Sequence, residues 1–108
     1  MTPVLDRTSA LFKALGSPVR LAVVTTLDEH GPLCVHELVD RLGASQPLVS
    51  QHLRVLRDAD VVRGVRRGKE IAYEIADAHV AHIVADALRH TGEDRAGERP
   101  ALRTEASA

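Results

Sequence analysis

The spacing of hydrophobic residues predicts two helices at the start of the chain. Apolar residues recur at helical intervals from Leu5 to Leu15, and a glycine interrupts the pattern. Ser17 and Pro18 then combine a capping residue with a proline suited to the first turn of a helix. This second helix is expected to close at the glycine after His30. The first third of the chain is therefore helical, and its first helix has a face suited to burial.

A helix-turn-helix is predicted in the middle of the chain. One face of the segment from Val35 to Leu42 is apolar, and the glycine after it stops the helix. Ser45 ends a short turn and can cap a further helix from Gln46 to about Ala59, called the recognition helix below. Two helices joined by a short glycine-containing turn form this motif. The residues of the recognition helix expected to face inward are Leu48, Val49, Leu53 and Leu56.

After residue 60 the pattern changes from helical to strand-like. Valine, isoleucine and tyrosine residues alternate or cluster from Val61 to Ile75, on both sides of a tetrapeptide from Arg66 to Lys69 that carries three cations. This pattern predicts a basic β-hairpin over residues 61–75, called the wing below. Asp77 can then cap a last helix from Ala78 to about His90.

Composition and length define the expected fold class. Only 2% of the 108 residues are aromatic and 44% are hydrophobic, so the core must be largely aliphatic, which favours helices over a large sheet. We expect a mainly α fold with a small β-hairpin, a winged helix-turn-helix domain over residues 1–93. Residues 94–108 lack periodicity and are expected to form a disordered tail. A chain of this length buries a modest fraction of its surface alone, so a partner chain is expected.

Several absences restrict the compartment and the class of protein that the sequence predicts. The single cysteine, Cys34, excludes an internal disulfide framework. No N-terminal stretch resembles a signal peptide, and no segment approaches ~20 consecutive apolar residues. We therefore expect a cytoplasmic protein without a membrane partner. No nucleophile arrangement or glycine-rich phosphate loop is visible, so neither an enzyme nor an organic cofactor is expected.

The distribution of charge indicates a polyanionic partner. The net charge is −1, but the segment from Arg41 to Lys69 contains seven basic and two acidic residues, a local balance of +5. Outward polar residues of the recognition helix can hydrogen-bond base edges or phosphates in the major groove of double-stranded DNA. A merely solvated face is the alternative, but such a face does not require a cationic wing beside it. The residues expected to contact DNA are Ser45, Gln46, Ser50, Gln51, Arg54, Arg66, Arg67 and Lys69.

The last predicted helix and its flanking residues carry four side chains of zinc-ligand type. These residues are Asp77, His79, His90 and Glu93. The eleven residue steps from His79 to His90 turn the helix by about 1100°, which is only ~20° more than three full turns, so the two imidazoles lie on the same face. Along the helix axis, however, they are roughly 16 Å apart. One ion cannot bridge that distance, so a second chain must supply ligands. Asp77 and Glu93 have nearly the same midpoint as the histidines, so two antiparallel helices crossing near Val84 would form two sites per homodimer. The alternative is that all four are ordinary surface residues.

Four stretches of the sequence form a recognisable set. They run from Phe12 to Leu21, from Leu33 to Leu38, from Ser45 to Leu53 and from Gly68 to Tyr73. In this order and spacing they resemble the ArsR/SmtB family of metal-sensing repressors, over about residues 8 to 93. The resemblance implies a homodimer formed by the first and last helices, which leaves its operator DNA when an inducer binds. The spacing Asp-x-His, ten residues, His-x-x-Glu is similar to the family's metal site on the C-terminal helix.

The ligand set favours Zn(II) over other metals. Two imidazoles and two carboxylates suit a tetrahedral Zn(II) or Co(II) site. Relatives that sense Ni(II) or Co(II) add ligands, often histidines from a tail, whereas residues 94–108 contain neither His nor Cys. A repressor that responds to Ni(II), to Co(II) or to a non-metal inducer is the alternative. His82 lies one turn from His79 and could be an extra ligand, although a helix-surface role is simpler.

A weak second metal site is a further hypothesis. Some family members bind metal or arsenic through a Cys-Val-Cys segment near the third helix, and that segment here runs from Cys34 to His36 with Glu37 after it. One cysteine cannot supply three thiolates, and no Cys or His precedes Asp6 to complete the set. Cys34, His36 and Glu37 could form a weak site, but a buried and inert Cys34 is the simpler interpretation.

Overall fold

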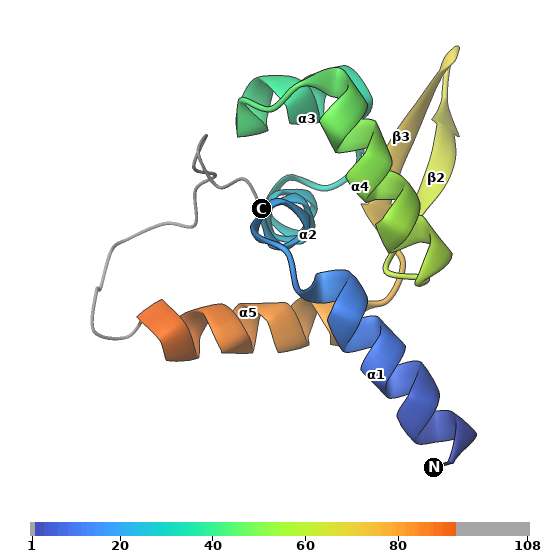
Figure 1. The fold of residues 1–108 in the computed structure, drawn as a ribbon. Coiled ribbons are helices and arrows are strands. Elements are labelled where there is room, and N and C mark those ends of the chain that lie inside the picture. Colours follow the sequence, from blue (N-terminus) through green and yellow to red (C-terminus); the bar gives the residue numbers. More distant parts are fainter. Residues whose placement is uncertain (1, 93–108) are drawn as a thin grey trace.

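Five helices and a three-stranded antiparallel sheet form the part of the protein that the computed structural model describes, residues 2–92 (Figure 1). The helices are α1 (Pro3–Leu15), α2 (Pro18–His30), α3 (Val35–Leu42), α4 (Gln46–Asp58) and α5 (Ala78–Gly92). The strands are β1 (Leu33–Cys34), β2 (Val62–Arg67) and β3 (Glu70–Ile75). The predicted mainly α fold class with a β-hairpin is confirmed. The predicted disordered tail and the candidate ligand Glu93 lie outside the described residues.

Local sequence signals account for where three of the helices begin. The hydroxyl oxygens of Thr2, Ser17 and Ser45 accept the backbone N–H three residues later, at 3.1, 3.3 and 3.3 Å. A proline follows each of them within the first helical turn, where its missing N–H leaves no hydrogen bond unmade. Gly43 ends α3 at φ 68°, a left-handed conformation that a Cβ disfavours. The turn between α3 and α4 is therefore short, and the predicted helix-turn-helix is confirmed.

The sheet places the wing against the start of α3. Its strand order is β1-β3-β2, and the hairpin ends with Arg67 opposite Glu70. Gly68 in the turn has φ 65°, so the tight reversal depends on a glycine. Strand β1 pairs Cys34 with Ala72, two residues after Glu70. Because side chains two residues apart in a strand share a face, the pairing brings Glu70 near Cys34.

The hydrophobic core lies between the helices and the base of the sheet. Its largest fully buried side chains are Leu27, Leu38, Leu56, Val23, Val24, Val49, Val61 and Val62. In α4 the buried residues are Val49, Leu53 and Leu56. Leu48 was expected to face inward, but it is 37% exposed, so that prediction is wrong. It precedes Val49 by one residue and therefore lies about 100° around the helix from the buried stripe.

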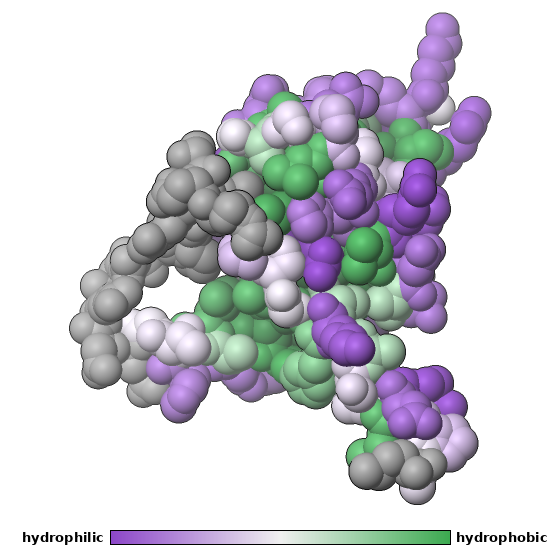
Figure 2. Space-filling view, in the orientation of Figure 1, coloured by the Kyte–Doolittle hydropathy of each residue, from purple (hydrophilic) through white to green (hydrophobic). Residues whose placement is uncertain are grey.

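Helix α1 leaves most of its apolar side chains in solvent. Only Ala14 and Leu15 of this helix are buried, while Leu5 and Phe12 are each 54% exposed. Figure 1 shows α1 extending away from the rest of the chain, and Figure 2 shows hydrophobic surface over α5. The apolar face predicted for the first helix is therefore not covered within one chain. By length and composition, no single helix among residues 2–92 is suited to span a membrane. Helices α1 and α2 are long and apolar enough only when taken together, and they are bent by 90° relative to each other.

Candidate DNA interface and metal-binding residues

The face of α4 opposite its buried stripe presents the polar residues predicted to contact DNA. Ser50, Gln51 and Arg54 are exposed and lie away from the stripe, and Gln46 is exposed at the first position of the helix. Ser45 is also exposed, but its hydroxyl oxygen accepts the Leu48 N–H, so it acts as the helix cap. Figure 1 shows α4 beside strands β2 and β3. One side of the molecule therefore combines hydrogen-bonding groups of α4 with the cationic wing.

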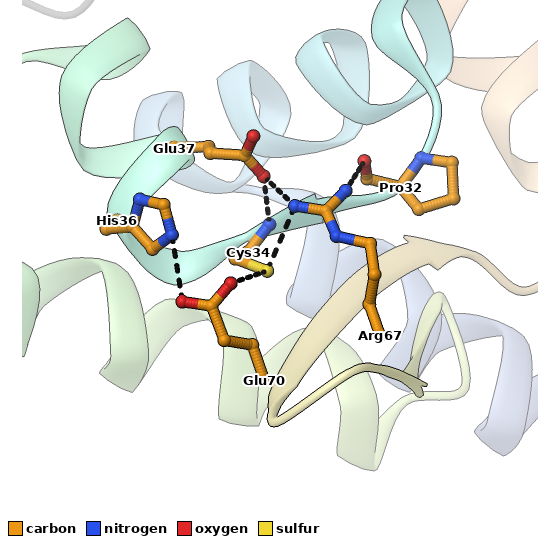
Figure 3. A network of polar contacts seen from close by, with 6 residues as sticks. All are labelled: Pro32, Cys34, His36, Glu37, Arg67 and Glu70. Carbon is orange, nitrogen blue, oxygen red and sulfur yellow. Dashed lines mark hydrogen bonds and ion pairs between the residues drawn. The ribbon is translucent and has the colours of Figure 1, made fainter.

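The three wing cations have different environments. Arg66 and Lys69 are exposed. Arg67 forms an ion pair with Glu37 at 2.5 Å and donates hydrogen bonds to Cys34 Sγ at 3.1 Å and to the Pro32 carbonyl oxygen at 3.3 Å (Figure 3). Arg66 and Lys69 are thus better placed to meet phosphates, and the DNA contact expected of Arg67 stays a prediction.

A hydrogen bond between α2 and α4 helps to fix the orientation of the recognition helix. Arg20 donates its Nε–H to the Ala14 carbonyl oxygen at 2.5 Å, and its Nη1 lies 3.0 Å from His52 Nδ1. A guanidinium can only donate, so His52 Nδ1 accepts and the imidazole is neutral. Burial, and then the charge of Arg20, lower the pKa of His52. The sequence did not predict this contact because 32 residues separate the two side chains and no motif marks them.

Asp77 and His79 lie together at the start of α5. The His79 N–H donates to Asp77 Oδ1 at 2.8 Å, which confirms the predicted cap, and His79 Nδ1 lies 3.1 Å from the same oxygen. The backbone hydrogen bond, followed by the imidazole contact, holds the pKa of Asp77 below its ordinary value. The His79 side chain is 95% exposed. Since Nδ1 faces the carboxylate, Nε2 is the ring nitrogen that remains to bind a metal ion or a group of another molecule.

The other candidate ligands on α5 are placed but not brought together. His90 is exposed near the end of the same continuous helix, and Glu93 lies outside the described residues. His82 Nε2 lies 3.4 Å from Asp86 Oδ2, one turn further along α5. This contact agrees with a helix-surface role for His82. The assembly of Asp77, His79, His90 and Glu93 into one site requires a second chain and stays a prediction.

Cys34 is part of a polar cluster formed by β1, α3 and the wing (Figure 3). Its Sγ lies 3.3 Å from Glu70 Oε1, and His36 Nε2 lies 3.1 Å from Glu70 Oε2. Burial of the thiol and its hydrogen bond to Glu70 raise the pKa of Cys34. One potential ligand atom from each of Cys34, His36 and Glu70 lies within 4.8 Å of the other two. The cluster has the donor types of a zinc site.

The third member of this cluster differs from the sequence prediction. Glu37 was expected to join Cys34 and His36, but its Oε1 accepts the Cys34 N–H at 2.8 Å and pairs with Arg67. The hydrogen bond from the Cys34 backbone has the largest effect and that from Arg67 the next largest, and both hold the pKa of Glu37 below its ordinary value. Glu70 takes the third position instead. Pairing of β1 with β3 brings it there, and a two-residue strand has no detectable period in the sequence.

The helix-turn-helix of α3 and α4, followed by a basic hairpin, is a winged helix-turn-helix DNA-binding domain. The chain belongs to the arsR family of bacterial regulatory proteins, whose family model matches residues 17–63. The protein is therefore a DNA-binding transcriptional repressor and not an enzyme.

Relatives support this assignment in sequence and in structure. The chain is 55% identical over 91 residues to the HTH-type transcriptional repressor SmtB of Mycobacterium tuberculosis, covering 84% of this chain and 67% of that protein. The crystal structure of the transcriptional repressor BigR from Xylella fastidiosa is 39% identical with a TM-score of 0.71, covering 81% of this chain and 87% of that one. A homodimeric winged helix-turn-helix domain from Mycobacterium bovis is 25% identical with a TM-score of 0.75, covering 89% and 88%.

The wing and the recognition helix should differ in how their substitution affects DNA binding. We expect Arg66→Ala or Lys69→Ala to weaken binding to all DNA, and to reduce the slope of log affinity against log salt by about one for each phosphate interaction that is removed. Gln46→Ala or Ser50→Ala should weaken mainly the cognate operator, by about 1–3 kcal/mol, because base contacts carry specificity. Fluorescence anisotropy on cognate and random duplexes at several salt concentrations measures both. Equal reductions on both duplexes for all four variants would contradict the assignment.

Proposed function

We propose that the protein is a metal-responsive repressor that binds double-stranded operator DNA as a homodimer in its metal-free state and leaves it when Zn(II) binds to α5. The ligands are Asp77 and His79 of one protomer with the partner's His90 and the partner's Glu93, twice per dimer. The observation that carries the proposal is the continuity of α5 from Ala78 to Gly92. One unbroken helix keeps the two histidines on one exposed face at the spacing that a two-fold axis requires. The repressor acts in the cytoplasm, where the operator lies.

Uncovered apolar surface supports the homodimer. The exposed large hydrophobic residues of α1 and α5 are Val4, Leu5, Phe12 and Ile83. Patches of this kind on a small chain usually mark an interaction surface. The related Mycobacterium bovis domain is described as homodimeric. A two-fold dimer through α1 and α5 would cover these residues and would place two copies of α4 for two half-sites of an operator.

The donor set supports Zn(II) at α5. Two imidazoles and two carboxylates match the tetrahedral coordination that zinc prefers. Asp77 and His79 are already adjacent at the exposed start of α5, where Asp77 Oδ1 lies 3.1 Å from His79 Nδ1. Zinc then neutralises the carboxylates and joins the two protomers.

Metal and DNA are linked through the dimer geometry. The two recognition helices must match half-sites about one DNA turn apart. Zinc bridging two crossing helices fixes the angle between the protomers and hence that spacing. By reciprocity, the factor by which zinc weakens operator binding equals the factor by which the operator weakens zinc binding. Such coupling typically amounts to about 5–150-fold in affinity.

Titration of the purified dimer with Zn(II) on its own promoter DNA tests this function. We expect operator affinity to fall by about 5–150-fold at saturating zinc and to recover when the metal is chelated. Isothermal titration of the free protein should show two equivalent tight α5 sites per dimer. Parallel titrations with Co(II) and Ni(II) identify the metal with the largest effect. Operator affinity that is unchanged or increased by all three metals would overturn the proposal in favour of a non-metal inducer.

A further inference from the structure

The outer half of the wing is joined to the rest of the protein by polar side chains. Val62 and Ala72 are buried at the base of the hairpin, whereas residues 66–71 are all exposed. Figure 1 shows the hairpin of β2 and β3 extending outward beside α4. Arg67 and Glu70 make the hydrogen bonds that connect this outer segment to other parts of residues 2–92. Hydrophobic packing therefore fixes the base of the wing, and these contacts fix its end.

Arg67 has three partners in the segment that leads into α3 (Figure 3). Its Nη1 donates to the Pro32 carbonyl oxygen at 3.3 Å, and its Nη2 donates to Cys34 Sγ at 3.1 Å and to Glu37 Oε1 at 2.5 Å. Glu37 Oε1 also accepts the Cys34 N–H at 2.8 Å, so the backbone at the start of α3 holds the carboxylate in place. An isolated exposed ion pair contributes little, but here one planar guanidinium meets three acceptors.

We propose that Arg67 and Glu37 form a clamp that sets the position of the wing for DNA binding. Arg67 then acts as a positioning residue, in place of the phosphate contact that the sequence predicts for it. Neighbouring residues of a strand point to opposite faces, so the clamp holds Arg67 on one face and leaves Arg66 exposed on the other. Lys69 is exposed in the turn that follows. An acidic residue, Glu37, thus supports the binding of a polyanion.

The clamp affects affinity through the fraction of time that the wing spends in its DNA-binding position. A wing that is released occupies other positions as well, and the apparent affinity falls in proportion to the binding-competent fraction. The complex, once formed, still uses Arg66 and Lys69, so the number of phosphates neutralised and the salt dependence stay the same. The proposal rests on the DNA binding of the family and is independent of the metal response proposed for α5.

Glu37→Gln tests the clamp because charge and position predict opposite effects. The glutamine amide oxygen can still accept the Cys34 N–H, so α3 keeps its first hydrogen bond while Arg67 loses its charged partner. By charge alone, removing a carboxylate strengthens the attraction to phosphates. Loss of the clamp should instead weaken operator binding of the metal-free protein by about tenfold or more, if the wing then holds its position about a tenth of the time. Unchanged or increased affinity, measured by fluorescence anisotropy, would overturn the proposal.

Glu74→Gln is the matched control. Glu74 also pairs with an arginine, Arg63 at 2.7 Å, but both residues lie within the hairpin and face each other across β2 and β3. Its replacement removes the same charge without releasing the wing from α3, so operator affinity should not fall. Circular dichroism and thermal unfolding confirm that each variant is folded. An equal decrease in both variants would show that the Arg67–Glu37 pair has no special role.

Arg67→Gln distinguishes positioning from direct contact with phosphate. It should weaken binding about as much as Glu37→Gln and leave the slope of log affinity against log salt unchanged, whereas Arg66→Ala lowers that slope by about one. The double variant should bind within about twofold of Arg67→Gln, because the clamp is already broken. Hydrogen exchange of residues 66–71 should be faster in both single variants. A slope lowered by about one in Arg67→Gln, independent effects in the double variant, or unchanged exchange would overturn the clamp.

Discussion

Zinc should no longer release the operator when Asp77 and His79 are replaced in both protomers. The replacement removes half of each proposed α5 ligand set, so zinc affinity should fall by several orders of magnitude and the zinc effect on DNA should disappear. Asp77 also caps α5, and replacing a cap by alanine costs about 0.5–2 kcal/mol. Asp77→Asn with His79→Ala keeps a capping oxygen while it removes the charge and the imidazole. Operator affinity with and without saturating Zn(II), together with zinc titration of the free protein, measures the effect.

A mixed dimer distinguishes a shared site from a site within one chain. One wild-type chain paired with one chain carrying Asp77→Asn and His79→Ala should bind one zinc at α5, because each site draws on opposite ends of two helices. His82→Ala is the matched control, since His82 is an exposed histidine of the same helix that contacts Asp86. It should keep two sites and a full zinc response. Two tight sites in the mixed dimer would contradict the crossed arrangement of α5.

Helices with a regular spacing of apolar residues, or with a capping residue or glycine at one end, could be predicted from the sequence. Helix α3 begins and ends where its apolar face and its terminal glycine indicate. The recognition helix and the cap at Asp77 also follow the pattern, because capping residues act on backbone groups within three positions. The solvent exposure of the polar residues of α4 followed in turn, since a helix with one buried stripe exposes its other faces.

Contacts between distant segments could not be predicted in the same way. Leu48 was assigned to the inward face together with the other apolar residues of its helix, but its position beside Val49 places it off the buried stripe. Strand β1 has only two residues, which is too few to show the alternation of apolar and polar residues that marks a strand. The approach of Glu70 to Cys34 could therefore not be predicted from the sequence. The hydrogen bond from Arg20 to His52 likewise depends on how α2 packs against α4. Each of these features is set by tertiary packing, which overrides local preference.

Replacing Phe12 by aspartate should dissociate the dimer and thereby abolish tight operator binding. Phe12 is 54% exposed on α1 and lies seven residues from Leu5, on the same face of the helix. A charge there would have to be buried unpaired in the α1–α5 interface, which is strongly unfavourable. A dimer binds its second half-site with an effective concentration that typically adds about 10²–10⁴-fold to the affinity. We expect a decrease of that size on the full operator.

Ala10→Asp is the control for this effect because it adds the same charge to the same helix. Ala10 is exposed and lies two residues before Phe12, so the two side chains point about 160° apart around α1. This variant should stay dimeric and keep its operator affinity. Sedimentation velocity gives the mass, circular dichroism reports folding, and anisotropy on full and half operators gives the affinities. On a single half-site, Phe12→Asp should bind as tightly as the wild type, since α4 and the wing are intact. A dimeric Phe12→Asp variant with wild-type affinity, or the same decrease in Ala10→Asp, would show that α1 does not hold the protomers together.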